Sequence, residues 1–220
     1  MKLELYPNVH LVEKVRGCNC YLVARPELSV IDTGISGQAK VILNYISTLG
    51  LDPLDLRRIF LTHHDIDHIG SAAELQKLTG AEVCMHPADA DCVVGKAKRR
   101  PFWKNWLSSL ATALKKLQTP EINCLVHDGE TIGAIQVIHT PGHSAGSISL
   151  QYGSVLFVGD LVRGGSSLRE AFFLADEDRT QVQASIRRIC ELDIEVICPG
   201  HGRVVFNASG KLRELVACWA

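Results

Sequence analysis

The sequence predicts an α/β protein of four layers, α/β/β/α, in which two sheets pack face to face and a metal site lies along one edge of the pair. Short apolar runs separated by Gly, Pro and polar turns recur in both halves of the chain, and each half also contains segments with helical spacing. Several His and Asp residues directly follow apolar runs, where strands pass into loops. Because strands hold such loops rigidly, they are favoured places for function.

Size and composition fit one domain spanning residues 1–220. The chain has 220 residues, of which 46% are hydrophobic, and this is enough for a substantial core. The net charge of −1 argues against a nucleic-acid partner. The sequence begins without a basic leader followed by an apolar segment, and no apolar run approaches the roughly 20 residues that span a bilayer. We therefore expect a soluble, cytoplasmic protein with no membrane partner, whose eight scattered cysteines are reduced.

The first half of the chain is predicted to form strands that alternate with helices. Three strands separated by turn residues are expected at 9–12, 20–23 and 28–31, and a helix with apolar residues on one face at 39–46. A strand at 58–61 follows, then a helix at 71–78, and then a strand at 82–85. Ser71 is the expected N-cap of that helix, with Glu74 three residues later.

The second half repeats this pattern. Strands are expected at 135–138, 147–150, 155–158 and 195–198, and a helix at about 180–192 precedes the last of them. Two strand-rich halves that each end in helices fit the four-layer arrangement.

The segment at about 95–118 is predicted to be helical. It starts with the basic run 96–100, and one helix face then carries Trp103, Leu107, Leu110, Leu114 and Leu117. The favoured interpretation is a peripheral helix that packs on the sandwich with a solvated basic end. A second interpretation is a lid or substrate wall over the metal site, with Trp103 and Trp106 binding substrate; membrane-surface docking and dimerisation are the remaining alternatives.

Residues 63–68 contain the densest set of metal-binding side chains. Five of these six residues are His or Asp, and three further candidates, His143, Asp160 and His201, each follow an apolar run. Imidazole and carboxylate together suit Zn, Fe or Mn, and more than four such ligands indicate two ions in one site.

These motifs resemble those of the metallo-β-lactamase superfamily. The matching segments follow the family's order and approximate spacing over nearly the whole chain: Asp32-Thr33-Gly34, Thr62-His63-x-Asp65-x-Asp67-His68-x-Gly70, Thr140-Pro141-Gly142-His143-Ser144-x-Gly146, Gly159-Asp160 and Pro199-Gly200-His201-Gly202. The resemblance implies the four-layer metallo-β-lactamase sandwich with two divalent ions, most commonly zinc.

The resemblance also implies a role for each matched residue. His63 and His143 would bind the first ion, with Asp65 where the family usually has a second His. The second ion would be held by Asp67, His68 and His201. Asp160 would bridge the two ions, with a water or hydroxide between them, and Asp32 would orient the ligand loop without binding a metal.

Asp65 is the departure from the family's pattern. A carboxylate in place of an imidazole favours Fe or Mn relative to Zn. Direct coordination by Asp65 is the favoured interpretation; a weakened first site, or a role limited to hydrogen bonding, are the alternatives. His64 is expected to point away from the metals. The remaining histidines, His10, His86, His127 and His139, are expected to be structural or exposed.

The leading functional hypothesis is a dinuclear metal-dependent hydrolase of a small molecule. A bridging hydroxide would attack an ester, thioester, lactone or phosphoester, with Asp67 and Asp160 as the catalytic carboxylates. The alternative is a non-haem iron oxidoreductase acting on oxygen or sulfur at the same site, and a binding module without turnover is the third hypothesis. A homodimer is left open.

Overall fold

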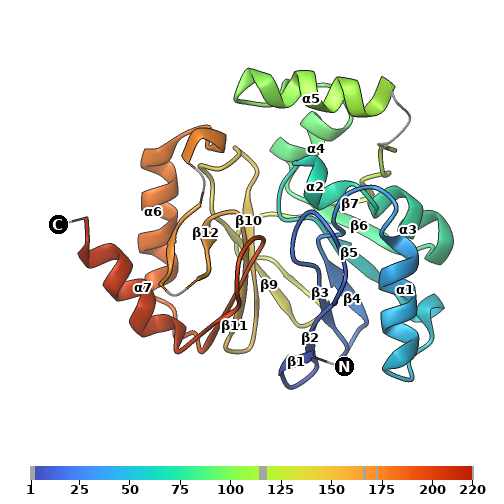
Figure 1. Ribbon diagram of the computed structural model, residues 1–220, viewed down its shortest axis with the longest axis horizontal. Coiled ribbons are helices and arrows are strands. Elements are labelled where there is room, and N and C mark those ends of the chain that lie inside the picture. The colour runs from blue at the N-terminus through green and yellow to red at the C-terminus, as the bar shows by residue number, and fades with distance from the viewer. Residues whose placement is uncertain (1–2, 114–117, 166, 172, 220) are drawn as a thin grey trace.

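Two sheets lie face to face at the centre of the computed structural model, which describes residues 3–113, 118–165, 167–171 and 173–219 (Figure 1). The first sheet has the order β1-β2-β3-β4-β5-β6-β7. Its strands are β1 (Leu3–Tyr6), β2 (Val9–Leu11), β3 (Tyr21–Val23), β4 (Ser29–Ile31), β5 (Arg58–Phe60), β6 (Glu82–Met85) and β7 (Cys124–Leu125).

The second sheet has the order β15-β14-β11-β10-β9-β8. Its strands are β8 (Thr131–Ile132), β9 (Ile135–His139), β10 (Ile148–Tyr152), β11 (Val155–Gly159), β14 (Val196–Pro199) and β15 (Val205–Phe206). A separate antiparallel pair joins β12 (Val162–Arg163) to β13 (Arg169–Glu170).

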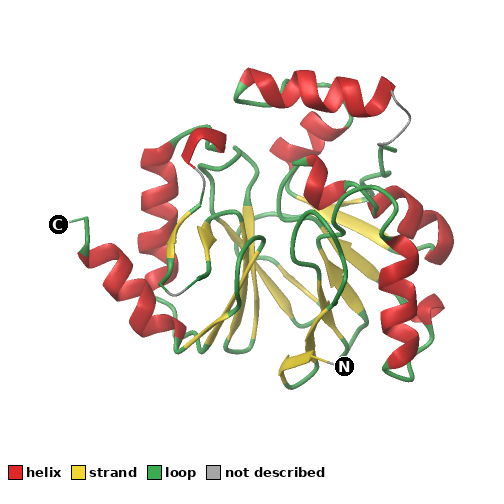
Figure 2. Cartoon of the chain, viewed as in Figure 1, coloured by secondary structure: helices red, strands yellow, loops and turns green. Residues whose placement is uncertain are grey.

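Helices cover the outer face of each sheet (Figure 2). The first sheet carries α1 and α3, the second carries α6 and α7, and α5 lies across the end of the molecule where α2 and α4 are found (Figure 1). The helices are α1 (Ala39–Thr48), α2 (Ile66–Ile69), α3 (Ala72–Thr79), α4 (Pro87–Val93), α5 (Phe102–Ala113), α6 (Arg179–Cys190) and α7 (Ala208–Ala217), with short 3₁₀ turns at Pro53–Asp55 and Phe173–Ala175. None of the described helices is long and apolar enough to cross a membrane.

Alternating side chains on the strands build the layers. On β3 and its neighbour β4, Leu22 and Val30 are buried with Ile42 of α1 in the core outside the first sheet. Tyr21, one position away, points to the opposite face and meets Phe157 of the second sheet, with ring centroids 5.4 Å apart. This period of two is what a strand buried on both faces requires. The predicted four-layer α/β fold is confirmed.

Parallel pairing brings the loops that carry the predicted ligands to one edge. Strand β4 is parallel to β5 in the first sheet, and β11 is parallel to β14 in the second, so the loops that follow them emerge on the same side. The two sheets are tied together there, because the Asn19 amide donates to Pro199 O and Gly202 O at 2.9 Å and the Tyr21 hydroxyl donates to Pro199 O at 2.7 Å. The loop edge is therefore a rigid junction.

Ser71 precedes α3 as predicted, but its side chain does not cap that helix. Its hydroxyl accepts the Gln38 N–H at 2.7 Å and donates to Ile35 O at 2.7 Å. The capping interpretation was wrong: the hydroxyl instead fastens the loop before α1. Helices α4 and α7 were not predicted.

Helix α5 begins later than predicted, and its apolar side chains are more exposed than predicted. Residues 96–101 are not helical, and Leu114, Leu117 and the side chain of Leu107 lie outside the described residues. Trp103 and Leu110 are 39% and 43% exposed, whereas Lys104 is only 4% exposed. Trp103 and Leu110 are therefore only partly covered, and a lysine is the buried contact. The predicted solvated basic end is wrong at Arg99, which is 5% exposed.

Candidate metal centre

Six predicted ligands converge at the loop edge. His63 follows β5, Asp67 and His68 lie in α2, and the others follow β9, β11 and β14. Two groups of described side chains have ligand atoms within 4.8 Å of one another: His63 with His143 and Asp160, and Asp67 with His68 and His201. Asp160 also faces the second group, since its Oδ1 lies 3.4 Å from His68 Nε2 and its Oδ2 lies 3.4 Å from His201 Nε2. Its position between the groups suits a shared ligand.

Unpartnered buried atoms test whether these residues fit metal ions. Within the described residues, His63 Nε2 and Asp160 Oδ1 are buried and make no hydrogen bond. Buried polar atoms almost always have a partner, so two orphans in one cluster point to a missing cation. Imidazole nitrogen with carboxylate oxygen is a donor set that Zn, Fe and Mn accept. The residues fit divalent metal ions.

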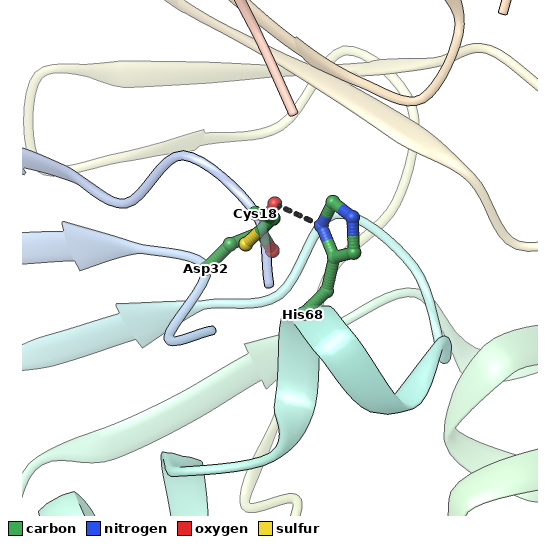
Figure 3. Close-up of side chains that lie close together, drawn as sticks. All are labelled: Cys18, Asp32 and His68. Atoms are coloured by element: carbon green, nitrogen blue, oxygen red, sulfur yellow. Dashed lines mark hydrogen bonds and ion pairs between the residues drawn. The ribbon is translucent and has the colours of Figure 1, made fainter. Parts of the chain in front are cut away.

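Asp32 holds His68 in the orientation that such a centre needs (Figure 3). Its Oδ2 lies 2.8 Å from His68 Nδ1, and it also accepts the Thr62 amide at 2.9 Å and the Thr62 hydroxyl at 2.8 Å. With Nδ1–H donated to the carboxylate, the lone pair of His68 lies on Nε2, facing the centre. Cys18 lies beside this pair and could form a third donor group with it. Asp32 already has these partners, so we interpret the group as support for His68.

His143 is oriented in the same way by Asp176. Its Nδ1 lies 2.9 Å from Asp176 Oδ1, which directs Nε2 to the centre. In the neighbouring imidazole, His63 Nδ1 lies 3.0 Å from the Thr62 hydroxyl, which again leaves Nε2 facing the centre. Asp176 was missed by the sequence reasoning, although it directly follows the apolar run 171–175, because no strand was predicted there and it lies 33 residues from His143.

Opposite charges stabilise one another across the centre. Burial lowers the pKa of His143, but hydrogen bonds to Asp176 and Asp65 outweigh it and raise the pKa to about 9. Hydrogen bonds to Asp160 and Asp67 raise the pKa of His201 to about 9. Burial opposes ionisation of Asp160, yet the positive potential of His68 and a hydrogen bond from His201 hold its pKa well below the ordinary value. Cations and protons therefore compete for these donors.

Asp65 contacts the centre but lies in neither donor group. Its Oδ2 is 3.2 Å from His143 Nε2 and 3.7 Å from His63 Nε2. The same oxygen is 2.8 Å from Lys104 Nζ, which comes from α5. Burial raises the pKa of Asp65, but hydrogen bonds with His143 and His63 and the charge of Lys104 bring it well below the ordinary value. The residue is thus an anion that already has a cationic partner.

Asp89 of α4 supports the loops behind the ligands. Its Oδ2 accepts the His64 amide at 2.8 Å and the Ser144 hydroxyl at 2.7 Å, and its Oδ1 accepts the Gly146 amide at 2.7 Å. His64 Nδ1 lies 2.9 Å from the same carboxylate, so this ring serves Asp89 and belongs to neither donor group. A Cβ at Gly146 would lie 2.5 Å from the Asp89 nitrogen, which explains the glycine in that motif.

The other predicted side chains lie farther out. His139 stacks on His86 with ring centroids 4.3 Å apart, and every cysteine within the described residues is free. A cavity of about 70 Å³ opens beside the centre and is lined by Asp65, Ile66, Asp67, Arg99, Trp103 and Lys104. Trp106 is not among the described residues that line it, and its side chain is 69% exposed. Of the two tryptophans, only Trp103 is placed to meet a substrate there.

Comparisons with known proteins agree on the family. Residues 14–201 match the model of the metallo-beta-lactamase superfamily. The probable metallo-hydrolase YflN of Bacillus subtilis (strain 168) is 27% identical, with 86% of this chain and 81% of YflN covered. A hydroxyacylglutathione hydrolase of Shewanella baltica (strain OS223) is also 27% identical over 74% of this chain, which spans about half (53%) of that relative.

Solved structures share the fold. A metallo-beta-lactamase family protein of Thermus thermophilus superposes with a TM-score of 0.73 at 23% identity, covering 98% of this chain and 80% of that protein. TTHA1623, crystallised in a di-iron-bound form, has a TM-score of 0.69 at 29% identity over 87% of this chain and 91% of its own. Sequence match, fold and donor cluster coincide, and the chain belongs to the metallo-β-lactamase superfamily, whose members are mostly metal-dependent hydrolases.

Proposed function

We propose that this protein is a dinuclear metal-dependent hydrolase that cleaves an ester, thioester, lactone or phosphoester in a small molecule. The observation that carries the proposal is the pair of donor groups that meet at Asp160, with the buried His63 Nε2 and Asp160 Oδ1 lacking hydrogen-bond partners within the described chain. Relatives named as a probable metallo-hydrolase and as a hydroxyacylglutathione hydrolase support the same class of reaction.

Two sets of side chains would each hold one metal ion. His63 and His143 would hold one ion, Asp67, His68 and His201 the other, and Asp160 would contact both. Divalent ions bound at such a centre supply Lewis acidity, which lowers the pKa of a water and stabilises a developing oxyanion. Zinc is the expected metal, and the carboxylate of Asp65 keeps iron and manganese as alternatives.

Asp67 would act on the reacting water. Its side chain is 34% exposed and lines the cavity, while its Oδ2 lies 3.3 Å from His201 Nε2. Burial raises its pKa, but the hydrogen bond with His201 and the charge of His68 bring it below the ordinary value. An ionised carboxylate between the donors and the cavity can accept a hydrogen bond from the attacking water and orient it.

One observation favours a second candidate. The 29% identical relative TTHA1623 was crystallised with two irons, and Asp65 adds a hard ligand atom near the first donor group. A non-haem iron oxidoreductase acting on oxygen or sulfur is therefore the alternative function of the same centre.

Elemental analysis of protein purified without added metal tests the proposal. About two zinc or manganese ions per chain, with hydrolysis of an ester, thioester, lactone or phosphoester panel, is the expected result. Asp160→Asn should lose hydrolysis by about a thousandfold while the protein remains folded, since it removes a charge shared by both groups. Iron-loaded protein that consumes oxygen without hydrolysing any member of the panel would support the oxidoreductase instead. Unchanged hydrolysis in Asp160→Asn would refute the site assignment.

A further inference from the structure

Lys104 is a buried cation inside a predicted cation site. It lies in α5, its side chain is 4% exposed, and its Nζ is 2.8 Å from Asp65 Oδ2 and 3.3 Å from His143 Nε2. Lysine is almost never fully buried unless it is paired. The neighbours of Lys104 on the same helix, Phe102 and Trp106, are 85% and 69% exposed. Of these three side chains only Lys104 contacts the donor atoms, and Trp103 lines the cavity beside it.

The ammonium group contacts atoms that a metal ion would use. Asp65 Oδ2 and His143 Nε2 lie 3.2 Å from each other, and Lys104 Nζ is within 3.3 Å of both. An ion bound to His143 would therefore have a positive charge as a close neighbour, and like charges in a buried site repel strongly. Lys104 also neutralises Asp65, the carboxylate that stands beside His63 and His143 where the family usually has a second His. Both effects weaken divalent binding at His63 and His143.

The other half of the centre is more negative than the side of Lys104, where Asp176 also faces His143 at 2.9 Å but Lys104 offsets the charge of Asp65. His68 pairs with the carboxylates of Asp32 and Asp160, at 2.8 Å and 3.4 Å. His201 pairs with Asp67 and Asp160, at 3.3 Å and 3.4 Å. Carboxylates around two imidazoles attract a divalent cation. The two donor groups thus differ in charge although they share Asp160.

We propose that the positive charge of Lys104 gives the two metal sites unequal affinities for divalent ions. The Asp67–His68–His201 group binds the first ion, and the His63–His143 group binds a second ion only as the Lys104 side chain withdraws from Asp65. This inference rests on the proposed metal centre and adds a determinant of its loading. Because Lys104 lies on α5, filling the second site is coupled to the placement of that helix, which carries Trp103 and Trp106.

Calorimetric titration of the metal-stripped full chain with Zn²⁺ tests the proposal. Wild-type protein should bind two ions in separate steps, with the second Kd larger by roughly tenfold or more. Lys104→Met and Lys104→Gln should each tighten the second step by a similar factor and leave the first unchanged. Tryptophan fluorescence should change with the second equivalent of zinc in the wild type, as α5 responds.

Matched variants separate this effect from a general loss of charge or of folding. Lys96→Met removes one positive charge from the exposed part of the same segment and should leave both steps as in the wild type. Circular dichroism checks that each variant is folded, and Lys104→Gln retains a polar partner for Asp65. Anomalous diffraction at one equivalent of zinc should place the ion at Asp67, His68 and His201.

The outcomes distinguish the two proposals. Two equal sites in the wild type, or an unchanged second step in both Lys104 variants, would overturn the role of Lys104 and leave the hydrolase proposal standing. A first ion found at His63 and His143 would also overturn it. No zinc binding by the wild type would refute the metal centre itself, and the inference with it.

Discussion

Two walls enclose the candidate metal centre, and they are built differently. The inner wall consists of the loops after β4, β5, β11 and β14, with Asp32, Asp160 and Gly200. Its side chains are joined by buried hydrogen bonds, such as those from Thr62 and His68 to Asp32. The outer wall is α5, which reaches the centre through the side chains of Lys104 and Trp103.

The difference separates two properties of the site. Positions of the ligand atoms depend on the inner wall, where strands of two sheets and a network of buried partners determine each side chain. Charge and access depend on the outer wall, where substitutions in α5 could alter them without moving a ligand. Changes to the inner wall should therefore alter ligand placement, metal binding or stability according to the contact removed, and changes to the outer wall should act locally.

Gly200→Ala should have the largest effect on activity and zinc binding, because the added methyl group displaces side chains of the inner wall. A Cβ at this position would collide with Asp160 Oδ1 and lie 2.6 Å from His68 Cε1. Displacing two ligands by this amount should lower kcat/KM by about a hundredfold and weaken zinc binding. Steady-state kinetics and metal analysis measure both. Gly210→Ala in α7, where a Cβ meets nothing within 4 Å, is the matched control and should leave both values unchanged. If Gly200→Ala binds zinc as tightly as the wild type, the loops of the inner wall accommodate the added Cβ without displacing Asp160 and His68.

Asp32→Asn tests whether hydrogen bonding inside the inner wall orients a ligand. Asparagine keeps the shape of the side chain but loses the charge that holds His68 Nδ1–H at 2.8 Å. Zinc affinity should fall roughly tenfold to a hundredfold, the usual effect of losing such a partner. A competitive chelator titration measures it, and circular dichroism reports folding. If affinity stays at the wild-type value, the orientation of His68 does not depend on the Asp32 charge.

Asp89→Asn should affect stability more than chemistry, because Asp89 supports the inner wall from behind. Burial raises its pKa, but the charge of His64 and hydrogen bonds from His64 and Ser144 lower it from 3.8 to about 2. A depressed pKa stabilises the folded state above pH 4, and this contribution is lost as pH falls through about 2. The shift corresponds to about 2 kcal/mol at neutral pH. Urea unfolding of wild type and variant should differ at pH 7 and converge toward pH 2. A difference that does not shrink with pH would exclude the charge as its source.

The sequence predicted which residues gather at the candidate centre better than which residues support them, Asp32 excepted. His63 follows β5 of the first sheet, and His143, Asp160 and His201 follow strands of the second, so each lies where an apolar run passes into a loop at the shared edge. That local pattern, together with the family motifs, indicated these four residues. Asp89 lies 25 residues from His64, and Lys104 lies 39 from His143. Such pairs are created by tertiary packing, and no local spacing records them. Which side of α5 faces the centre could not be predicted either. The spacing of its apolar residues indicates a helix but does not show which part of the protein the helix packs against.

The smallest effect is expected at the exposed face of the outer wall. Trp106 is 69% exposed and Trp103 lines the cavity, although the two are nearly one turn apart. Trp106→Ala should change the free energy of unfolding by less than about 0.5 kcal/mol, as is usual for an exposed side chain. Trp103→Ala should raise KM with little change in kcat, because it removes a contact that substrate and transition state share. Urea unfolding and steady-state kinetics on the pair test this. Equal KM values for the two variants would mean that α5 does not form a wall of the substrate site, whereas a higher KM in Trp103→Ala alone would place the substrate on the side of α5 that carries Lys104.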